Sequence, residues 1–365
     1  MGIAMQGTAA AGRAPTVVVY GASGHTGAFV VAELLRRGLT PVAAGRDAER
    51  LATRGFDPER VATRVADAAD PAALDRAFSG AAAVLNCAGP FLDTAAPVAA
   101  AALRSGAHYL DVTAEQASAT HLLDAFADDA RRAGVAVVPA VSFYGGLADL
   151  LVTAVTAGWT DVEEVEVAIA LDSWHPTPGT RLTGRRNTWP RLVVDSGRLV
   201  PLEQPAAQTT LTFASPFGVQ PVTAVPFSEM PLIDRHLPVR RVRTWLTDTA
   251  LTDLRDPSTP PPEAADASGR SAQQFLVEVT ARGKAGGTGG AGHASTRHAS
   301  ARGRDIYAVT APLVVEAVQR LLLDASRPAG TFAPGEVFDA ADFLASLPAA
   351  ALDVTLDATV TEAAE

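Results

Sequence analysis

The first part of the chain alternates short apolar runs with amphipathic segments, which is the pattern of strands and helices in turn. Apolar runs predict strands at 17–20, 39–44, 62–66, 82–85, 108–112 and 135–140. This spacing is typical of βαβ units, which build a doubly wound parallel sheet with right-handed crossovers. We therefore expect an α/β, Rossmann-type fold for the segment that ends near residue 148.

The pattern changes after residue 148, because apolar alternation recurs there without helices between the strands. A helix is predicted at 147–155, followed by strands at 162–171, 191–194, 198–202 and 275–281. Strands that follow one another directly favour an antiparallel sheet. We expect a second, α+β domain with a largely antiparallel sheet, which covers the first domain and supplies a substrate pocket.

Two segments of biased composition interrupt this second domain. Residues 256–269 are rich in Pro, Ala and Asp, and residues 283–303 are rich in Gly, Ala and Ser. Both compositions are typical of mobile loops. For residues 283–303, a lid over the substrate and a connection between the strands of a hairpin are the two alternatives. A long amphipathic helix at about 305–323 is expected to pack back on the first domain.

The most informative segment joins the first strand to the first helix and carries three glycines. It consists of Gly21, Ala22, Ser23, Gly24, His25, Thr26 and Gly27. The first glycine permits a sharp turn, the second leaves room for a pyrophosphate, and the third lets the helix lie close to its strand. The segment predicts a dinucleotide site at the helix N-terminus, where amide groups and the dipole favour phosphate. A tight structural turn is the alternative.

The end of the second strand indicates which dinucleotide binds. Gly45 is followed by Arg46, at the place where a site for NAD carries an acidic side chain. A guanidinium pairs with a ribose 2′-phosphate, which a carboxylate would repel, so Arg46 predicts NADP. Arg50, one helical turn further, is placed to flank the same phosphate. Solvated surface charges are the alternative for both arginines.

Ligands of such folds bind beyond the carboxyl ends of the strands, which adds two further segments. Asp67 ends the third strand, and capping of the next helix or a place beside the adenine are equally open. The fourth strand leads into a Gly-Pro turn, where the backbone approaches the ribose and nicotinamide. We expect cofactor contacts from Asn86, Ala88, Gly89 and Pro90. An ordinary strand-end turn is the alternative.

Composition narrows the class of protein. The 365 residues are enough for two domains, and a formal net charge of −10 at pH 7 argues against a nucleic-acid or anionic-membrane binder. A single cysteine, Cys87, excludes an intramolecular disulfide framework and fits a reducing cytoplasm. No zinc-type spacing and no membrane-spanning apolar run occur, so we expect no metal and no membrane partner. The sole lysine, Lys284, excludes a Tyr-x-x-x-Lys proton relay.

Hydride transfer requires a proton donor beside the nicotinamide. Tyr144 is the first candidate, because it follows the sixth strand where the two domains should meet. An aromatic wall of the pocket is its alternative. His175 is the second candidate, with a surface histidine as the alternative. Asp111 and Glu115 lie at another strand end of the same crevice, and helix capping or ribose contact is favoured for Glu115.

A basic cluster stands out in this acidic chain. It consists of Arg181, Arg185 and Arg186. These side chains suit a substrate carboxylate or the phosphate of a carrier-bound thioester. A solvated helix face is the more common role of such runs.

Taken together, five segments resemble the saccharopine dehydrogenase-like reductases, in particular bacterial short forms that include trans-acting enoyl reductases. They are residues 21–27, 44–46, 86–91, 106–115 and 307–311. The resemblance implies an NADP-dependent reductase with a split nucleotide-binding domain at 15–148 and 304–350. It also implies a central domain at 149–303 for substrate binding and dimer formation. Flexible tails are expected at 1–14 and 351–365.

The sequence departs from that family at the expected substrate end. Ala114 and Glu115 stand where a Gly-Glu pair is expected, and residues 141–150 replace a Gly-Phe-Asp-Ser-x-Pro-type run. The substrate therefore stays open. We expect a cytoplasmic, homodimeric, NADPH-dependent oxidoreductase that transfers a hydride to a C=C, C=N or C=O bond of a small metabolite, free or carrier-bound. An NADP(H)-binding redox sensor and an atypical short-chain reductase are the alternatives.

Overall fold

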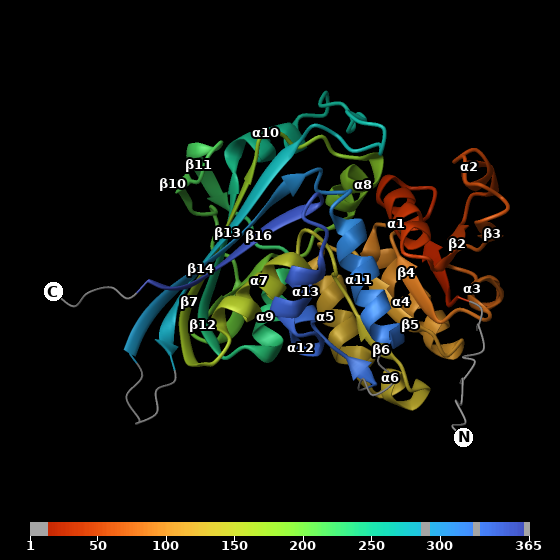
Figure 1. Cartoon of the computed structure of the whole chain (residues 1–365), viewed down its shortest axis with the longest axis horizontal. Helices are drawn as coiled ribbons and strands as arrows, with labels where there is room; N and C mark the ends of the chain where they lie inside the picture. The colour runs from red at the N-terminus through yellow and green to blue at the C-terminus, as the bar shows by residue number, and fades with distance from the viewer. Residues whose placement is uncertain (1–13, 286–292, 324–328, 361–365) are drawn as a thin grey trace, which may run out of the picture.

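The computed structural model describes residues 14–285, 293–323 and 329–360 and contains two sheets that lie side by side (Figure 1). The first sheet is entirely parallel, in the order β15-β6-β5-β4-β1-β2-β3. Its strands are β1 (Thr16–Tyr20), β2 (Thr40–Gly45), β3 (Ala62–Val65), β4 (Ala83–Asn86), β5 (His108–Asp111), β6 (Ala136–Val138) and β15 (Gly330–Thr331). The predicted Rossmann-type sheet is confirmed.

Apolar runs become strands here because both faces of the sheet are covered by helices. Val17, Val18 and Val19 of β1 are completely buried, the outer two in one core and the middle one in another. The covering helices of this first domain are α1 (His25–Arg36), α2 (Ala48–Ala52), α3 (Pro71–Phe78), α4 (Phe91–Arg104), α5 (Gln116–Ala125) and α6 (Ala127–Ala133).

The helix near the C-terminus, α11 (Thr310–Leu323), packs against α1, as the sequence predicts. Arg37, at the end of α1, donates to the side chains of Glu33, Glu316 and Gln319. Since the Arg37 side chain is 9% exposed, its ion pairs are nearly shielded from water and join two helices that are far apart in the chain.

The second sheet follows the order β10-β11-β12-β7-β13-β14-β16, with a β8-β9 hairpin beside β12. Its pairs are antiparallel except for β12 and β7, which are parallel, so the sheet is largely antiparallel as expected. Its strands are β7 (Trp159–Leu171), β8 (Leu192–Asp195), β9 (Arg198–Pro201), β10 (Gln208–Phe213), β11 (Gly218–Ala224), β12 (Val239–Thr247), β13 (Gln274–Ala285), β14 (His293–Arg304) and β16 (Leu352–Val360).

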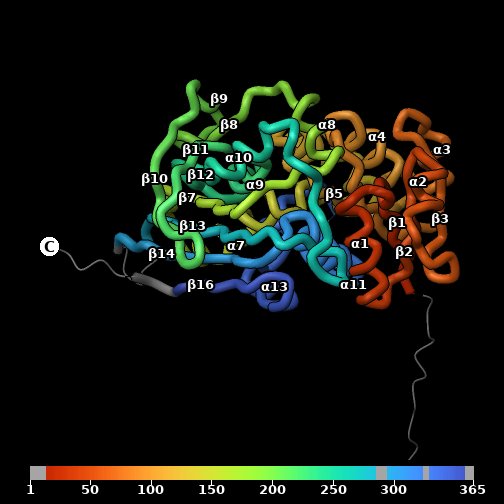
Figure 2. The backbone as a smooth tube through the Cα atoms, turned by 90° about the horizontal axis from the view of Figure 1, so that it is seen from above, coloured from red at the N-terminus to blue at the C-terminus, as the bar shows by residue number. Residues whose placement is uncertain are grey.

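Helix α7 (Gly146–Thr156) leads from the first sheet into the second domain and packs on β13 and β14 (Figures 1 and 2). Three further helices pack against α7, namely α13 (Ala340–Ser346), α12 (Pro334–Val337) and α9 (Glu229–His236). The remaining helices of the second domain are α8 (Pro178–Arg186) and α10 (Asp248–Arg255). The C-terminal segment thus serves both domains, because β15 pairs in the first sheet and α13 packs on α7.

The structure corrects one expectation about irregular segments and decides between the two alternatives for another. Residues 352–360, predicted to lie in a tail, form the edge strand β16 that pairs with β14. Most of residues 283–303 belong to the long hairpin of β13 and β14, which confirms the hairpin alternative for this segment, although its two arms are paired strands and not a loop. Small residues such as Ala299 and Ala301 are the inward positions of β14 and let it pack closely on the core. The predicted tail at 1–14 lies almost wholly outside the described residues.

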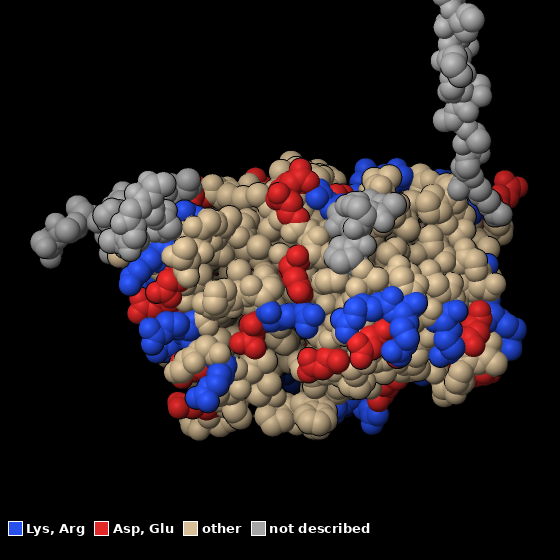
Figure 3. Space-filling model, turned by 90° about the horizontal axis from the view of Figure 1, so that it is seen from below, with Lys and Arg blue, Asp and Glu red and all other residues tan. Residues whose placement is uncertain are grey.

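The face of the molecule seen from below carries both signs of charge, interspersed among uncharged side chains (Figure 3). Pairs such as Arg235 with Glu336 bring opposite charges together. That face therefore presents no continuous basic patch of the kind that binds a polyanion.

Candidate functional site

The turn between β1 and α1 has a geometry that only glycine permits. Gly21 has a φ of +85°, and a Cβ there would lie 2.8 Å from the backbone nitrogen of Ala88. A Cβ on Gly27 would lie 2.3 Å from the carbonyl oxygen of Gly21, and one on Gly24 would lie 3.1 Å from the same oxygen. The turn is thus a close-packed cradle of backbone, as the glycine pattern predicts.

The N-terminus of α1 is free to receive an anion. Its N-cap, Gly24, makes no side-chain capping bond, and its first turn carries no acidic residue. The amide groups of this first turn therefore have no capping side chain, and the helix dipole favours negative charge there. The other members of the turn are Ala22, which is buried, and Ser23, His25 and Thr26, which are partly exposed.

Arg46 follows β2 at the edge of this cradle and is exposed. It forms no salt bridge with any acidic side chain in the described ranges, so its guanidinium is available. The Tyr20 hydroxyl donates to the Ala66 carbonyl oxygen at 3.2 Å. Burial and the charge of Asp67 raise the pKa of Tyr20 to about 12, while Arg46 opposes them. Arg46 and Asp67 therefore lie at the same edge of the sheet.

Asp67 does not cap helix α3, which was one of its two predicted roles. Its carboxylate accepts the amide of Ala69 at 2.8 Å within a turn, and the cap of α3 is Asp70, which accepts from Ala73 at 3.0 Å. The side chain of Asp67 is exposed. The place beside the adenine stays a prediction.

The turn after β4 is held from beneath by Asn86, whose side chain is completely buried. Its amide oxygen accepts the Ala88 amide at 3.0 Å, and its nitrogen donates to the Tyr109 hydroxyl at 3.2 Å. These bonds point the Asn86 side chain into the protein, so it supports the turn and its amide does not face a ligand. Gly89 lies on the surface of the turn, and Pro90 is the N-cap of α4.

The hydrogen bonds continue inward to a buried carboxylate. The Tyr109 hydroxyl donates to Asp111 at 2.9 Å, and Asp111 also accepts the amides of Thr113 at 3.1 Å and Ala140 at 2.8 Å. Burial raises the pKa of Asp111 to about 6, although these bonds oppose the shift. Asp111 thus ties the turn after β4 to the segment that leads to Tyr144.

Glu115 caps a helix, but not the one that follows it. Its carboxylate accepts the amides of Phe91 at 2.8 Å and Leu92 at 3.3 Å, in the first turn of α4. Burial raises the pKa of Glu115 to about 7, against the effect of these two bonds. It therefore fixes the start of α4 directly after Gly89 and Pro90.

Tyr144 lies in a stack of aromatic rings at the seam between the two domains. Its ring is 5.1 Å from that of Trp174 and 4.2 Å from that of Phe227, both nearly parallel to it. The guanidinium carbon of Arg191 lies over the Phe227 ring, 5.0 Å from its centroid. We refer to these four residues as the aromatic seam. They come from four separate segments, and only Tyr144 was predicted for this site.

The hydroxyl of Tyr144 is buried, and in the described part of the chain it has no hydrogen-bond partner. The residue is 8% exposed, and burial raises its pKa well above the usual value. The phenol is thus neutral at physiological pH and keeps its proton. A buried polar atom without a partner is costly, so a group from outside the described chain is its expected partner.

Tyr307 connects the aromatic seam to the glycine-rich turn. Its hydroxyl accepts from the indole nitrogen of Trp174 at 3.0 Å and lies 3.0 Å from the hydroxyl of Thr180. Its ring meets the His25 ring edge to face at 5.4 Å. The Tyr307 hydroxyl also donates to the backbone carbonyl oxygen of His175 at 3.3 Å, so His175 takes part in this network through its backbone. The sequence analysis assigned no role to Tyr307.

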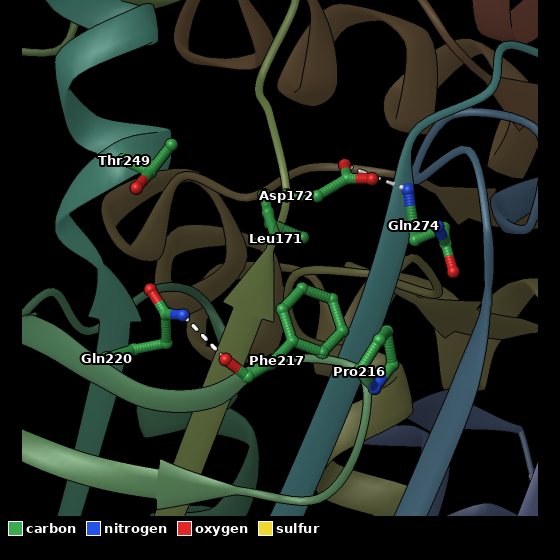
Figure 4. Close-up of a pocket in the computed structure, with 7 residues that line it drawn as sticks. All are labelled: Leu171, Asp172, Pro216, Phe217, Gln220, Thr249 and Gln274. Carbon is green, nitrogen blue, oxygen red and sulfur yellow. Dashed lines mark hydrogen bonds between the residues drawn. The ribbon is translucent and has the colours of Figure 1, made fainter.

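A hollow lies elsewhere, at the carboxyl end of β7 in the second domain (Figure 4). It has a volume of about 310 Å³. It is lined by Leu171, Asp172, Pro216, Phe217, Gln220, Thr249 and Gln274. None of these residues belongs to the glycine-rich turn or to the aromatic seam, so we do not assign the chemistry to this hollow.

Other kinds of site find no support within the described ranges. No three His, Cys, Asp or Glu side chains gather there as metal ligands. Burial raises the pKa of Cys87 to about 12, so its thiol is not a ready nucleophile. No helix in those ranges has the length and apolar character needed to cross a bilayer.

Comparison with known protein families indicates which cofactor the N-terminal domain binds. Residues 17–139 match the family described as the saccharopine dehydrogenase NADP-binding domain. The matched residues lie in the N-terminal domain and make up about a third of the chain. NADP is therefore the cofactor of this saccharopine dehydrogenase-type domain, in agreement with the prediction made from Arg46. The backbone cradle and the uncapped start of α1 fit the diphosphate of that cofactor.

Curated relatives resemble this part of the chain. A lipid droplet localized protein of Caenorhabditis elegans is 35% identical over 146 residues, which are 37% of this chain and 34% of that protein. A probable mitochondrial saccharopine dehydrogenase-like oxidoreductase of Arabidopsis thaliana is 34% identical over 35% of this chain and 31% of its own length. A trans-acting enoyl reductase of Mycobacterium leprae is 32% identical over 37% and 34%. The matched part thus spans about a third of each relative.

A solved structure resembles the chain over both domains. Apo saccharopine dehydrogenase (L-Glu forming) from Saccharomyces cerevisiae has a TM-score of 0.63 at 13% identity. The match covers 94% of this chain and all of that one. It shows that the saccharopine dehydrogenase-type domain and the second domain share the fold of that enzyme.

Proposed function

We propose that the protein is an NADPH-dependent oxidoreductase, which reduces a C=C, C=N or C=O bond of a small metabolite, free or carrier-bound. The observation that carries this proposal is the buried, unpartnered hydroxyl of Tyr144 at the seam between the domains. It is joined to the nucleotide turn through Trp174, Tyr307 and His25.

The residues of the first domain would hold the cofactor in the following way. The amides of the glycine-rich turn, from Gly21 to Gly27, bind the diphosphate, and Arg46 pairs with the 2′-phosphate. The turn at Gly89 lies against the ribose that carries the nicotinamide. NADPH, when bound, supplies a hydride.

Tyr144 has the chemistry of the proton donor that a reduction needs. Because burial raises its pKa, its phenol is protonated across the physiological range and donates to a developing negative charge on the substrate. The rings of Trp174 and Phe227 hold it in one orientation and exclude water. In the structure both faces of Tyr144 are covered, so a substrate reaches the hydroxyl along its edge or after the seam opens.

The experiment is a screen for NADPH oxidation by the full chain with cyclic imines, enoyl thioesters and ketones. Turnover of one class, dependent on NADPH, supports the proposal and names the bond. Tight NADPH binding without turnover in any class favours a redox sensor over an enzyme. Absence of NADPH binding by calorimetry contradicts both functions.

A further inference from the structure

Helix α8 belongs to the second domain by its place in the chain, yet it lies next to the first domain (Figures 1 and 2). Thr183, in its middle, has its hydroxyl oxygen only 2.8 Å from the position that a Cβ on Gly89 would occupy. At its end, Arg186 forms a salt bridge with Asp93 of α4 at 2.7 Å. The helix therefore covers the turn at which we place the nicotinamide ribose.

Polar contacts, and no buried side chain, hold α8 in this place. None of its residues is buried. Thr177 caps its first turn through the amide of Thr180 at 3.1 Å, and Thr180 contacts the Tyr307 hydroxyl at 3.0 Å. Arg181 donates to the carbonyl oxygens of Asp256 at 3.0 Å and Thr259 at 2.8 Å. A helix held by such contacts moves without loss of core packing, because it buries little apolar surface.

The hydroxyl of Thr183 has no hydrogen-bond partner of its own within the described ranges, although it faces the turn directly. Among the basic cluster predicted to bind a substrate, Arg181 and Arg186 are already paired with protein groups. Two of the three arginines of that cluster therefore anchor the helix, and the Thr183 hydroxyl is a polar group that faces the Gly89 turn. A hydroxyl donates and accepts, which suits a sugar hydroxyl or an amide.

We propose that α8 is a clamp from the second domain on the nicotinamide half of the coenzyme, with Thr183 as the residue that binds it. This inference rests on the proposed function, because the coenzyme is placed against Gly89 by that function. The clamp contacts the half of the coenzyme that carries the hydride, and Arg46 contacts the adenosine half. The two halves thus depend on different domains.

The test separates the two halves of the coenzyme. Calorimetry on the full chain compares NADPH with 2′,5′-ADP, which contains the adenosine half and its 2′-phosphate only. Thr183→Val keeps the shape of the side chain and removes its hydroxyl. We expect NADPH affinity to fall about 3- to 10-fold, the effect of one lost hydrogen bond, while 2′,5′-ADP affinity stays unchanged.

Two matched variants make the result decisive. Thr188→Val changes an exposed threonine beyond the end of α8 and should alter neither affinity. Arg46→Ala should weaken both ligands. Unchanged or increased NADPH affinity in Thr183→Val, or an equal loss for both ligands, overturns the clamp. If Arg46→Ala does not lower the affinity for 2′,5′-ADP, the proposed place of the 2′-phosphate is contradicted. The clamp is then still judged by the NADPH affinity of Thr183→Val.

Discussion

The glycine-rich turn and the aromatic seam are linked through Tyr307, but they are built in opposite ways. The turn is made of backbone from seven consecutive residues, and its shape depends on the absence of side chains at Gly21 and Gly27. The aromatic seam is made of side chains from four segments, of which Tyr144 and Phe227 are 83 positions apart.

This difference explains why one region binds a shared cofactor while the other is free to vary. A diphosphate is recognised by amide groups that every residue possesses, so the turn needs only the correct backbone path. A substrate is recognised by side chains, so each of the four segments of the aromatic seam contributes its own chemistry. Of the two departures from the family pattern, one falls at residues 141–150, which include Tyr144 of the aromatic seam, and the other at Ala114 and Glu115.

The largest effect is expected at the aromatic seam. Tyr144→Phe keeps the stacked ring and removes the hydroxyl, so we expect the chemical step to slow about a hundredfold, with NADPH affinity unchanged. Single-turnover kinetics at saturating NADPH measures this. Unchanged kinetics would assign Tyr144 to the wall of the pocket.

A single methyl group added to the glycine-rich turn should distort it and weaken NADPH binding. Gly27→Ala places a Cβ 2.3 Å from the Gly21 carbonyl oxygen, so α1 must shift away from the turn. We expect NADPH affinity to fall roughly 30-fold, the effect of overpacking by about 2 kcal/mol. Fluorescence titration with NADPH measures the loss, and circular dichroism checks that the variant folds.

The matched control is Gly184→Ala in α8, where a new methyl group meets no atom within 4 Å. This variant should bind NADPH as the unmodified protein does. Equal affinities in the Gly27 and Gly184 variants would mean that the turn tolerates a side chain and does not hold the diphosphate.

The ratio of the affinities for NADPH and NADH tests the role of Arg46. Arg46→Ala removes one exposed guanidinium, so we expect NADPH affinity to fall about tenfold while NADH affinity changes little. Competition titrations with both coenzymes measure the ratio. Arg60→Ala, also exposed, is the control, and equal losses for NADPH and NADH would contradict the assignment.

The smallest effect concerns the packing of α9 on α7. The His236 ring nitrogen lies 2.7 Å from the buried carboxylate of Asp149. Burial lowers the pKa of His236, but the charge and hydrogen bond of Asp149 raise it more, so it ends above its usual 6.5. The folded protein thus holds this proton more tightly than the unfolded chain does.

This stabilisation is fully present below pH 6.5 and is lost as the pH rises through the higher folded pKa. We expect the free energy of unfolding to fall by about 1 kcal/mol across that window. His236→Gln should remove this slope in urea unfolding, whereas substitution of the exposed His121 should keep it. The same slope in both variants would assign it to other groups.

The sequence predicts the strands of the first sheet better than those of the second sheet. The strands β1, β4 and β5 were placed to within a residue or two, because a strand buried on both faces is a continuous apolar run. The strand β12 was missed, since its outward positions carry Arg241 and Arg243 and only one face is apolar. Whether such a segment pairs depends on partners elsewhere in the chain.

The candidate site divides in the same way. The glycine-rich turn and Arg46 were predicted from short segments whose chemistry is local. The role of Tyr307 was not, because its hydrogen bond to Trp174 joins residues 133 positions apart. Asn86 was predicted to face the cofactor, but it turns inward to Tyr109, a partner that the sequence does not reveal.

The pairing of Arg37 with Glu316 bears on how the protein is made. These residues are separated by 279 positions, so the ribosome delivers α1 long before its partner α11. Until then Val30, Val31 and Leu34 have no α11 to cover them. The contact between α1 and α11 therefore forms only after the last fifth of the chain has begun to leave the ribosome, and until then this side of α1 is uncovered.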